Sequence, residues 1–106
     1  MLPTEIDSYV NRGILYKEIG QFEDALADYK ESLRLEPNDL DTYHNRSIVY
    51  AALGKYDLAV EDLNKYLELV PDDADDYLWR AECYEAMGDV RAAKEDRQKY
   101  EELKGK

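Results

Sequence analysis

Residues 40–73 of the 106-residue chain, LDTYHNRSIVYAALGKYDLAVEDLNKYLELVPDD, contain one unit of a pattern that occurs three times along the sequence. The positions identical in all three copies are Asp7/Asp41/Asp75, Tyr9/Tyr43/Tyr77, Arg12/Arg46/Arg80, Tyr16/Tyr50/Tyr84, Gly20/Gly54/Gly88, Ala25/Ala59/Ala93, Asp28/Asp62/Asp96 and Leu35/Leu69/Leu103. A fixed period of 34 residues is typical of stacked supersecondary units. We expect a lead of residues 1–5 and repeats at 6–39, 40–73 and 74–106, which together form a single domain.

Each unit carries the signals of two helices separated by a glycine. In the first unit, apolar residues recur at helical spacing before Gly20 and again from Phe22 to Leu35. The glycine ends the first helix, and Pro37 ends the second because the residue before a proline disfavours helix. Asn38 or Asp39 can cap the next helix. The later units predict helices near 39–53, 56–69, 73–87 and 89–104, so we expect an all-α fold of six helices without strands.

The composition excludes several classes of function. Fourteen Lys and Arg stand against 25 Asp and Glu, and the net charge of −11 argues against nucleic acid and anionic membranes as partners. No apolar run approaches the roughly 20 residues of a membrane span, and the first residues do not resemble a secretory signal. We therefore expect a cytoplasmic protein.

The sequence offers little material for catalysis or metal binding. His44 is the single histidine and Cys83 the single cysteine, and neither has an obvious partner for nucleophilic chemistry or for a zinc site. Carboxylates are abundant, but a stack of helix pairs offers an open groove and no enclosed pocket that would raise the pKa of one of them. We expect no enzymatic activity, no metal and no cofactor.

The repeat resembles the tetratricopeptide repeat over nearly the whole chain. Where that family has large, small and proline positions, the second unit has Tyr43, Tyr50, Tyr56 and Leu63, then Ser47 and Ala59, and finally Pro71. The third unit departs from the pattern in its last helix, as a polar terminal cap would. The resemblance implies a right-handed α-solenoid of three helix-turn-helix repeats, whose concave face binds peptide segments of other proteins.

In the family's geometry, one side of the first helix of each repeat faces this groove. The corresponding residues are Asp7, Val10, Asn11 and Ile14, then Asp41, His44, Asn45 and Ile48, then Asp75, Leu78, Trp79 and Glu82. They form an apolar line beside an acidic line, which favours a protein or peptide partner with basic and apolar residues. The aspartates can equally serve as helix caps, because they lie in the first turn.

One subgroup of the family uses a carboxylate clamp of lysines, asparagines and an arginine to grip acidic chaperone tails. The matching positions here hold Val10, Ile14, Asn45, Asp75 and Trp79, and only Asn45 agrees. Asp75 would repel an acidic tail, so we do not expect this mode of binding.

Three arginines recur sixteen residues before an aspartate, as Arg12 and Asp28, Arg46 and Asp62, and Arg80 and Asp96. This spacing predicts an ion pair between the two helices of each repeat, because an Arg fork suits a carboxylate. The alternative is a basic stripe that binds an anionic ligand.

Two functional hypotheses remain open. The first is a peptide-binding module, and the second is a structural or self-assembling scaffold, designed or an excised fragment, with no peptide ligand of its own. Trp79 discriminates between them, since exposure in the groove favours binding and burial between repeats favours the scaffold. In either case we expect a monomer or a weak homodimer.

Overall fold

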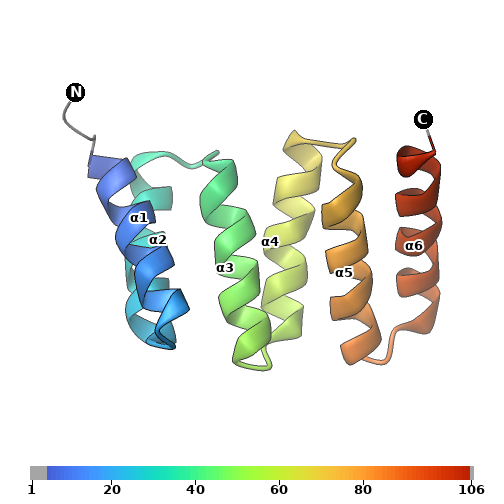
Figure 1. The fold of residues 1–106 in the computed structure, drawn as a ribbon, viewed down its shortest axis with the longest axis horizontal. Helices are drawn as coiled ribbons and strands as arrows, with labels where there is room; N and C mark the ends of the chain where they lie inside the picture. The colour runs from blue at the N-terminus through green and yellow to red at the C-terminus, as the bar shows by residue number, and fades with distance from the viewer. Residues whose placement is uncertain (1–4, 106) are drawn as a thin grey trace.

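The computed structural model describes residues 5–105, and its six helices follow one another along the long axis of the molecule, with the first drawn in front of the second (Figure 1). The helices are α1 (Glu5–Glu18), α2 (Phe22–Leu35), α3 (Leu40–Ala52), α4 (Tyr56–Leu69), α5 (Ala74–Ala86) and α6 (Val90–Lys104). These residues contain no strand, so the expected all-α solenoid of six helices is confirmed. Of the expected lead, residues 1–4 lie outside the described part, and so does Lys106 at the other end. None of the six helices is long and apolar enough to cross a membrane.

The two helices of each repeat are joined by the same glycine turn. Gly20, Gly54 and Gly88 have φ angles of 81°, 76° and 82°. This left-handed conformation is strained for residues with a Cβ atom, and glycine adopts it freely at the end of a helix. The chain therefore reverses direction at the same point in every unit.

Aspartates begin the first helix of the second and third repeats. Asp39 accepts a hydrogen bond from the backbone N–H of Thr42 at 3.1 Å, and Asp73 accepts one from that of Asp76 at 3.3 Å. Of the two expected caps, Asn38 and Asp39, the N-cap of α3 is Asp39. Each aspartate satisfies a backbone donor that the helix leaves unpaired at its start.

A tyrosine holds the loop that leads into each of these helices. The Tyr43 hydroxyl donates to the carbonyl of Pro37 at 2.7 Å, and the Tyr77 hydroxyl donates to that of Pro71 at 2.9 Å. Because both bonds span the same six residues, the proline turn has the same anchor in both places.

The core consists of two layers, each between consecutive repeats. The first layer contains Ala25 and Tyr29 of α2 and Val49 of α3. The second contains Ala51, Ala59, Val60, Leu63 and Cys83, from α3, α4 and α5. The first helix of each later repeat thus covers the second helix of the repeat before it.

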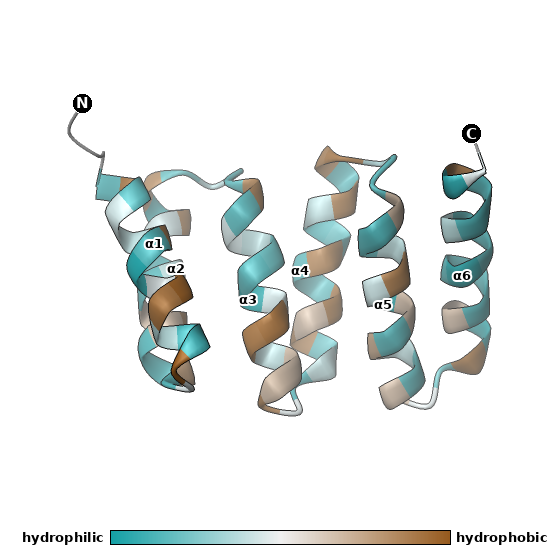
Figure 2. Cartoon of the chain, viewed as in Figure 1, coloured by the Kyte–Doolittle hydropathy of each residue, from teal (hydrophilic) through white to brown (hydrophobic). Residues whose placement is uncertain are grey.

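The last helix breaks this pattern of burial. Where α4 buries Val60, Leu63 and Leu67, the equivalent residues of α6 are Lys94, Arg97 and Glu101, and all three are exposed. Figure 2 accordingly shows α6 as predominantly hydrophilic. A polar outer face of this kind is what the terminal repeat of a solenoid requires in water.

Candidate peptide-binding groove

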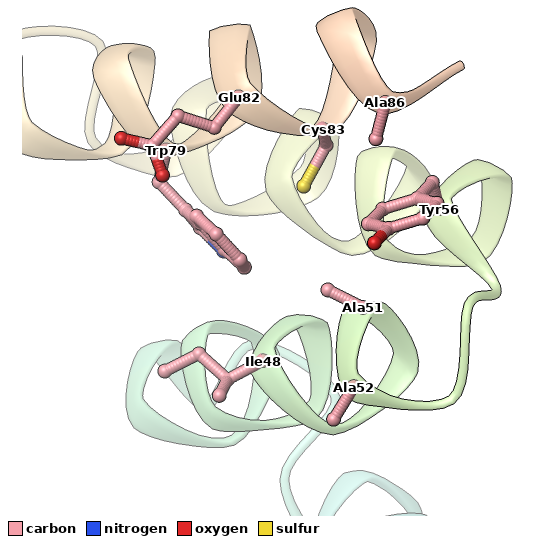
Figure 3. Close-up of a pocket in the computed structure, with 8 residues that line it drawn as sticks. All are labelled: Ile48, Ala51, Ala52, Tyr56, Trp79, Glu82, Cys83 and Ala86. Carbon is pink, nitrogen blue, oxygen red and sulfur yellow. The ribbon is translucent and has the colours of Figure 1, made fainter.

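A pocket of about 430 Å³ opens between α3 and α5. Its lining residues are Ile48, Ala51 and Ala52 of α3, Tyr56 of α4, and Trp79, Glu82, Cys83 and Ala86 of α5. Figure 3 shows the Trp79 ring reaching from α5 toward α3, with Ala86 and Tyr56 at the other end of the pocket. The walls are largely apolar, and Glu82 carries the formal charge at the exposed edge.

Trp79 belongs both to the pocket and to the packing between repeats. Its side chain is half-buried against the second core layer, and its Nε1 donates to Ser47 Oγ at 3.0 Å. Ser47 Oγ in turn donates to the carbonyl of His44 at 2.6 Å. The indole is therefore fixed in place, and one side of it remains available to the pocket.

His44 pairs with an aspartate of the next repeat. Its Nδ1 lies 3.0 Å from Asp76 Oδ2, and its ring centroid lies 5.9 Å from that of Tyr66. The Tyr66 hydroxyl donates to Asp73 Oδ2 at 2.6 Å, so α3, α4 and α5 meet at this cluster. The hydrogen bond with Asp76 raises the pKa of His44, while burial acts against that shift. The imidazole is consequently committed to a contact between repeats.

Asp76 lies outside the set of site residues predicted from the sequence, although the sequence contains a signal for it. The equivalent residues of the first two repeats are Ser8 and Thr42, so the third repeat alone has a carboxylate there. Asp76 is buried, and a buried carboxylate needs a partner. The single histidine, 32 residues earlier, supplies that partner.

The first repeat is linked to the second by polar side chains. Lys17 Nζ donates to Asn45 Oδ1 at 2.7 Å, and Asn45 Nδ2 donates to the carbonyl of Asp41 at 2.8 Å. Asn45, the one residue that matches the carboxylate clamp, is thus engaged by Lys17.

The structure brings only part of the expected groove set together. Ile48, Trp79 and Glu82 line the pocket, and His44 and Asn45 lie in the contacts between repeats. Val10 is buried and offers little surface to a ligand, contrary to the expectation for a groove residue. The remaining candidates are exposed or half-buried outside the pocket lining, and they are Asp7, Asn11, Ile14, Asp41, Asp75 and Leu78.

The three arginines each meet the aspartate sixteen residues later. The N–O distances are 2.6 Å for Arg12 and Asp28, 2.7 Å for Arg46 and Asp62, and 2.7 Å for Arg80 and Asp96. Each guanidinium donates through Nε and Nη2 to the two carboxylate oxygens. The aspartates are buried, whereas the arginine side chains are 57%, 21% and 18% exposed in chain order. This geometry links the helices and does not leave a free basic stripe.

Sequence models described as "Tetratricopeptide repeat" match residues 24–78 and residues 6–39. No curated protein is similar enough in sequence to count as a relative.

Several solved structures share the fold at low sequence identity. The first repeat domain of Spaghetti (RPAP3), bound to the HSP90 peptide SRMEEVD, is 23% identical with a TM-score of 0.88, and the match covers 95% of this chain and 80% of that one. The Sgt2 domain from Aspergillus fumigatus is 23% identical with a TM-score of 0.87, covering 97% and 68%. MamA is 22% identical with a TM-score of 0.90, covering 94% of this chain and 58% of MamA. Because the model at 24–78 spans more than half of the sequence and the helix pairs agree with it, the chain belongs to the tetratricopeptide repeat family.

Proposed function

We propose that this chain is a protein-interaction module that binds a peptide segment of a partner protein in the pocket between α3 and α5. The observation that carries the proposal is the pocket itself, whose apolar walls end at an exposed carboxylate, Glu82. The Spaghetti domain with the same fold is bound to a peptide, which supports this kind of function.

The pocket favours a segment that combines an apolar side chain with a neighbouring Lys or Arg. A volume of about 430 Å³ lies within the range of small ligand sites, and Ile48 and Trp79 supply apolar surface for an anchor side chain. Glu82 at the edge attracts a cation, and the Trp79 ring can accept one on its face.

The same charges count against capture of an acidic tail. The peptide bound by the Spaghetti domain, SRMEEVD, carries three acidic residues. Here the exposed Asp75 and Glu82 lie on α5, and Val10 and Ile14 occupy positions where the clamp has a lysine and an asparagine. We propose that this module selects against such tails by like-charge repulsion.

The proposal includes no enzymatic step. Burial raises the pKa of the Cys83 thiol to about 11, so at neutral pH the group is protonated and a poor nucleophile. A cytoplasmic setting, also part of the proposal, would keep this thiol reduced.

The test uses Trp79 as a probe, since it is the single tryptophan and lines the pocket. Three blocked peptides, Gly-Lys-Leu-Lys-Gly, Gly-Glu-Leu-Glu-Gly and Gly-Lys-Ser-Lys-Gly, are titrated while tryptophan emission is followed. We expect the first to bind most tightly, since it alone supplies both the apolar anchor and the cations. A preference for the acidic peptide would overturn the proposal.

Two variants locate the binding. Glu82→Lys reverses the charge at the pocket edge and should lower the affinity for the basic peptide by about tenfold. Glu61→Lys makes the same change at an exposed site of α4 outside the pocket lining and should leave binding unchanged. Equal affinity in both variants would place the peptide elsewhere.

The scaffold alternative is supported by the role of Trp79 in packing between repeats. A self-assembling scaffold should elute earlier from a sizing column as its concentration rises. We propose a monomer, because α6 presents charged residues where α4 presents its buried apolar ones.

A further inference from the structure

The outer face of α1 is the surface that the solenoid covers in its other repeats. Leu15 is 61% exposed, whereas the equivalent Val49 and Cys83 are fully buried. Ile19, directly after the last residue of α1, is also exposed, and Arg12 is the most exposed of the three paired arginines. Figure 1 shows α1 and α2 at one end of the row of helices. We call Arg12, Leu15 and Ile19 the α1 outer face.

In the later repeats this face rests on the second helix of the preceding repeat. Val49, together with Leu53, belongs to the core layer that contains Ala25 and Tyr29 of α2. Cys83 belongs to the layer that contains Val60 of α4. Because the repeats are equivalent, the surface that fits Leu15 and Ile19 is the apolar side of a similar amphipathic helix.

The polar part of the internal interface adds a second requirement. Arg80 donates to Asp96 through Nε and Nη2, and its Nη1 donates across the interface to Asn64 of α4 at 2.9 Å. Arg12 uses the same two nitrogens on Asp28. A helix that covers α1 in the same way would place a side-chain acceptor where Nη1 of Arg12 can reach it.

The far end of the molecule does not supply such a helix. The outer positions of α6 hold Lys94, Arg97 and Glu101, and burying them on Leu15 and Ile19 would remove three charged side chains from water against an apolar surface. A second copy stacked head to tail is therefore a poor occupant of the α1 outer face.

We propose that the α1 outer face docks an amphipathic helix of a partner protein. The partner helix has apolar residues at positions i, i+3 and i+7 and a hydrogen-bond acceptor such as Asn at i+4. In α4 the same positions hold Val60, Leu63, Leu67 and Asn64. This site lies outside the pocket between α3 and α5, and the proposal does not depend on peptide binding there.

The probe is the chain's own α4 as a blocked peptide, residues 56–69, titrated into the isotope-labelled protein and followed by amide chemical shifts. Short helices are marginal in water, so weak binding with residue-level detection is the appropriate measurement. We expect shifts at Arg12, Leu15 and Ile19. The control peptide carries Val60→Lys, Leu63→Arg and Leu67→Glu, the residues found in α6, and should produce none.

Leu15→Glu should lower the affinity for the α4 peptide by about tenfold, because it places a charge in the apolar contact. Ile19→Glu serves as a second variant at the same face. The matched control is Val90→Glu, which changes an exposed apolar residue of α6 and should have no effect.

Three results would overturn the proposal. The first is a set of shifts confined to the pocket residues Ile48, Trp79 and Glu82. The second is equal binding of the control peptide, or full binding to both Leu15→Glu and Ile19→Glu. The third is self-association of the wild-type protein that Leu15→Glu abolishes in sedimentation, which would make a second copy the occupant.

Discussion

The hydroxyl of Tyr29 is buried without a hydrogen-bond partner among residues 5–105. Its ring fills the space opposite Gly13, and burial raises the pKa of the phenol well above its usual range. A buried hydroxyl without a hydrogen bond lowers the free energy of unfolding by about 1–3 kcal/mol. The ring of Tyr29 therefore stabilises the fold by packing, and its hydroxyl does not.

Replacing Tyr29 with phenylalanine should therefore stabilise the protein. We expect Tyr29→Phe to raise the free energy of unfolding by about 1 kcal/mol, measured by urea denaturation. The matched control is Tyr43→Phe, which removes a hydroxyl that does donate, to Pro37, and should lower stability by about 0.5–1.5 kcal/mol. A destabilised Tyr29→Phe would show that the hydroxyl finds a partner in solution.

The arginine–aspartate pairs should differ in strength along the chain. Asp62 is buried and Arg46, its partner, is mostly buried. Arg46→Met should therefore lower the free energy of unfolding by about 3–5 kcal/mol, because it leaves a buried carboxylate without its counter-charge. Arg12→Met should cost less, because the Arg12 side chain is more than half exposed and solvent already screens its pair. Denaturant midpoints of the two variants provide the comparison, and equal losses would contradict the burial argument.

At the scale of the helix pair, the sizes of two facing residues vary inversely between the first and second repeats. Gly13 faces Tyr29 so closely that a Cβ atom would lie 2.5 Å from the ring carbon Cε1. The corresponding pair of the second repeat is Ser47 and Leu63. A smaller residue on the second helix thus accompanies a larger one on the first.

This relation predicts a compensating pair of substitutions. Gly13→Ser alone should destabilise the protein by about 1–3 kcal/mol through overpacking, and Tyr29→Leu alone should do so by leaving a cavity. The double variant recreates the combination of the second repeat, so its loss should be smaller than the sum of the two single losses. Simple additivity in thermal or urea unfolding would show that the two residues do not compete for space.

The helices could be predicted from the sequence because their limits are local. Gly54 and Pro71 mark the ends of α3 and α4 wherever the rest of the chain lies, and the period of 34 residues repeats the glycine three times and the proline twice. The arginine–aspartate spacing was equally informative, because both partners belong to one repeat.

The contacts between repeats could not be predicted in the same way. The bonds from Lys17 to Asn45 and from Trp79 to Ser47 join residues that the pattern does not repeat. They depend on the offset of one helix pair against the next, and the sequence does not encode that offset in any single motif. For the same reason the groove positions inferred from the family included the buried Val10.

At the scale of the whole molecule, polar bonds reinforce each junction of the solenoid. Lys17 and Asn45 join the first two repeats, while His44 and Asp76, with Trp79 and Ser47, join the second and third. In a solenoid each repeat contacts only its neighbours, so stability depends on these junctions. Residues of the second junction also line the pocket, so a change that disrupts this junction should also alter the proposed binding site.

The junction at His44 should make stability depend on pH. The hydrogen bond with Asp76 raises the pKa of His44 above its ordinary value of 6.5, and Asp73 adds to this while Lys17 opposes it. A histidine whose pKa is higher in the folded state stabilises the fold fully at low pH, and this contribution is lost as the pH rises through the folded-state pKa. The stabilisation from this pair should therefore be present near pH 5.5 and smaller near pH 8.5.

Urea midpoints of the wild type, His44→Gln and Asp76→Asn at about pH 5.5 and about pH 8.5 test this dependence. We expect His44→Gln to be destabilising at the lower pH and much less so at the higher one, because only protonated His44 forms a charged pair with Asp76. Asp76→Asn should lose the same pH dependence while keeping a hydrogen-bonding side chain at that position. If wild type and His44→Gln differ by the same amount at both values, the imidazole contributes by packing against Tyr66 and not by its charge.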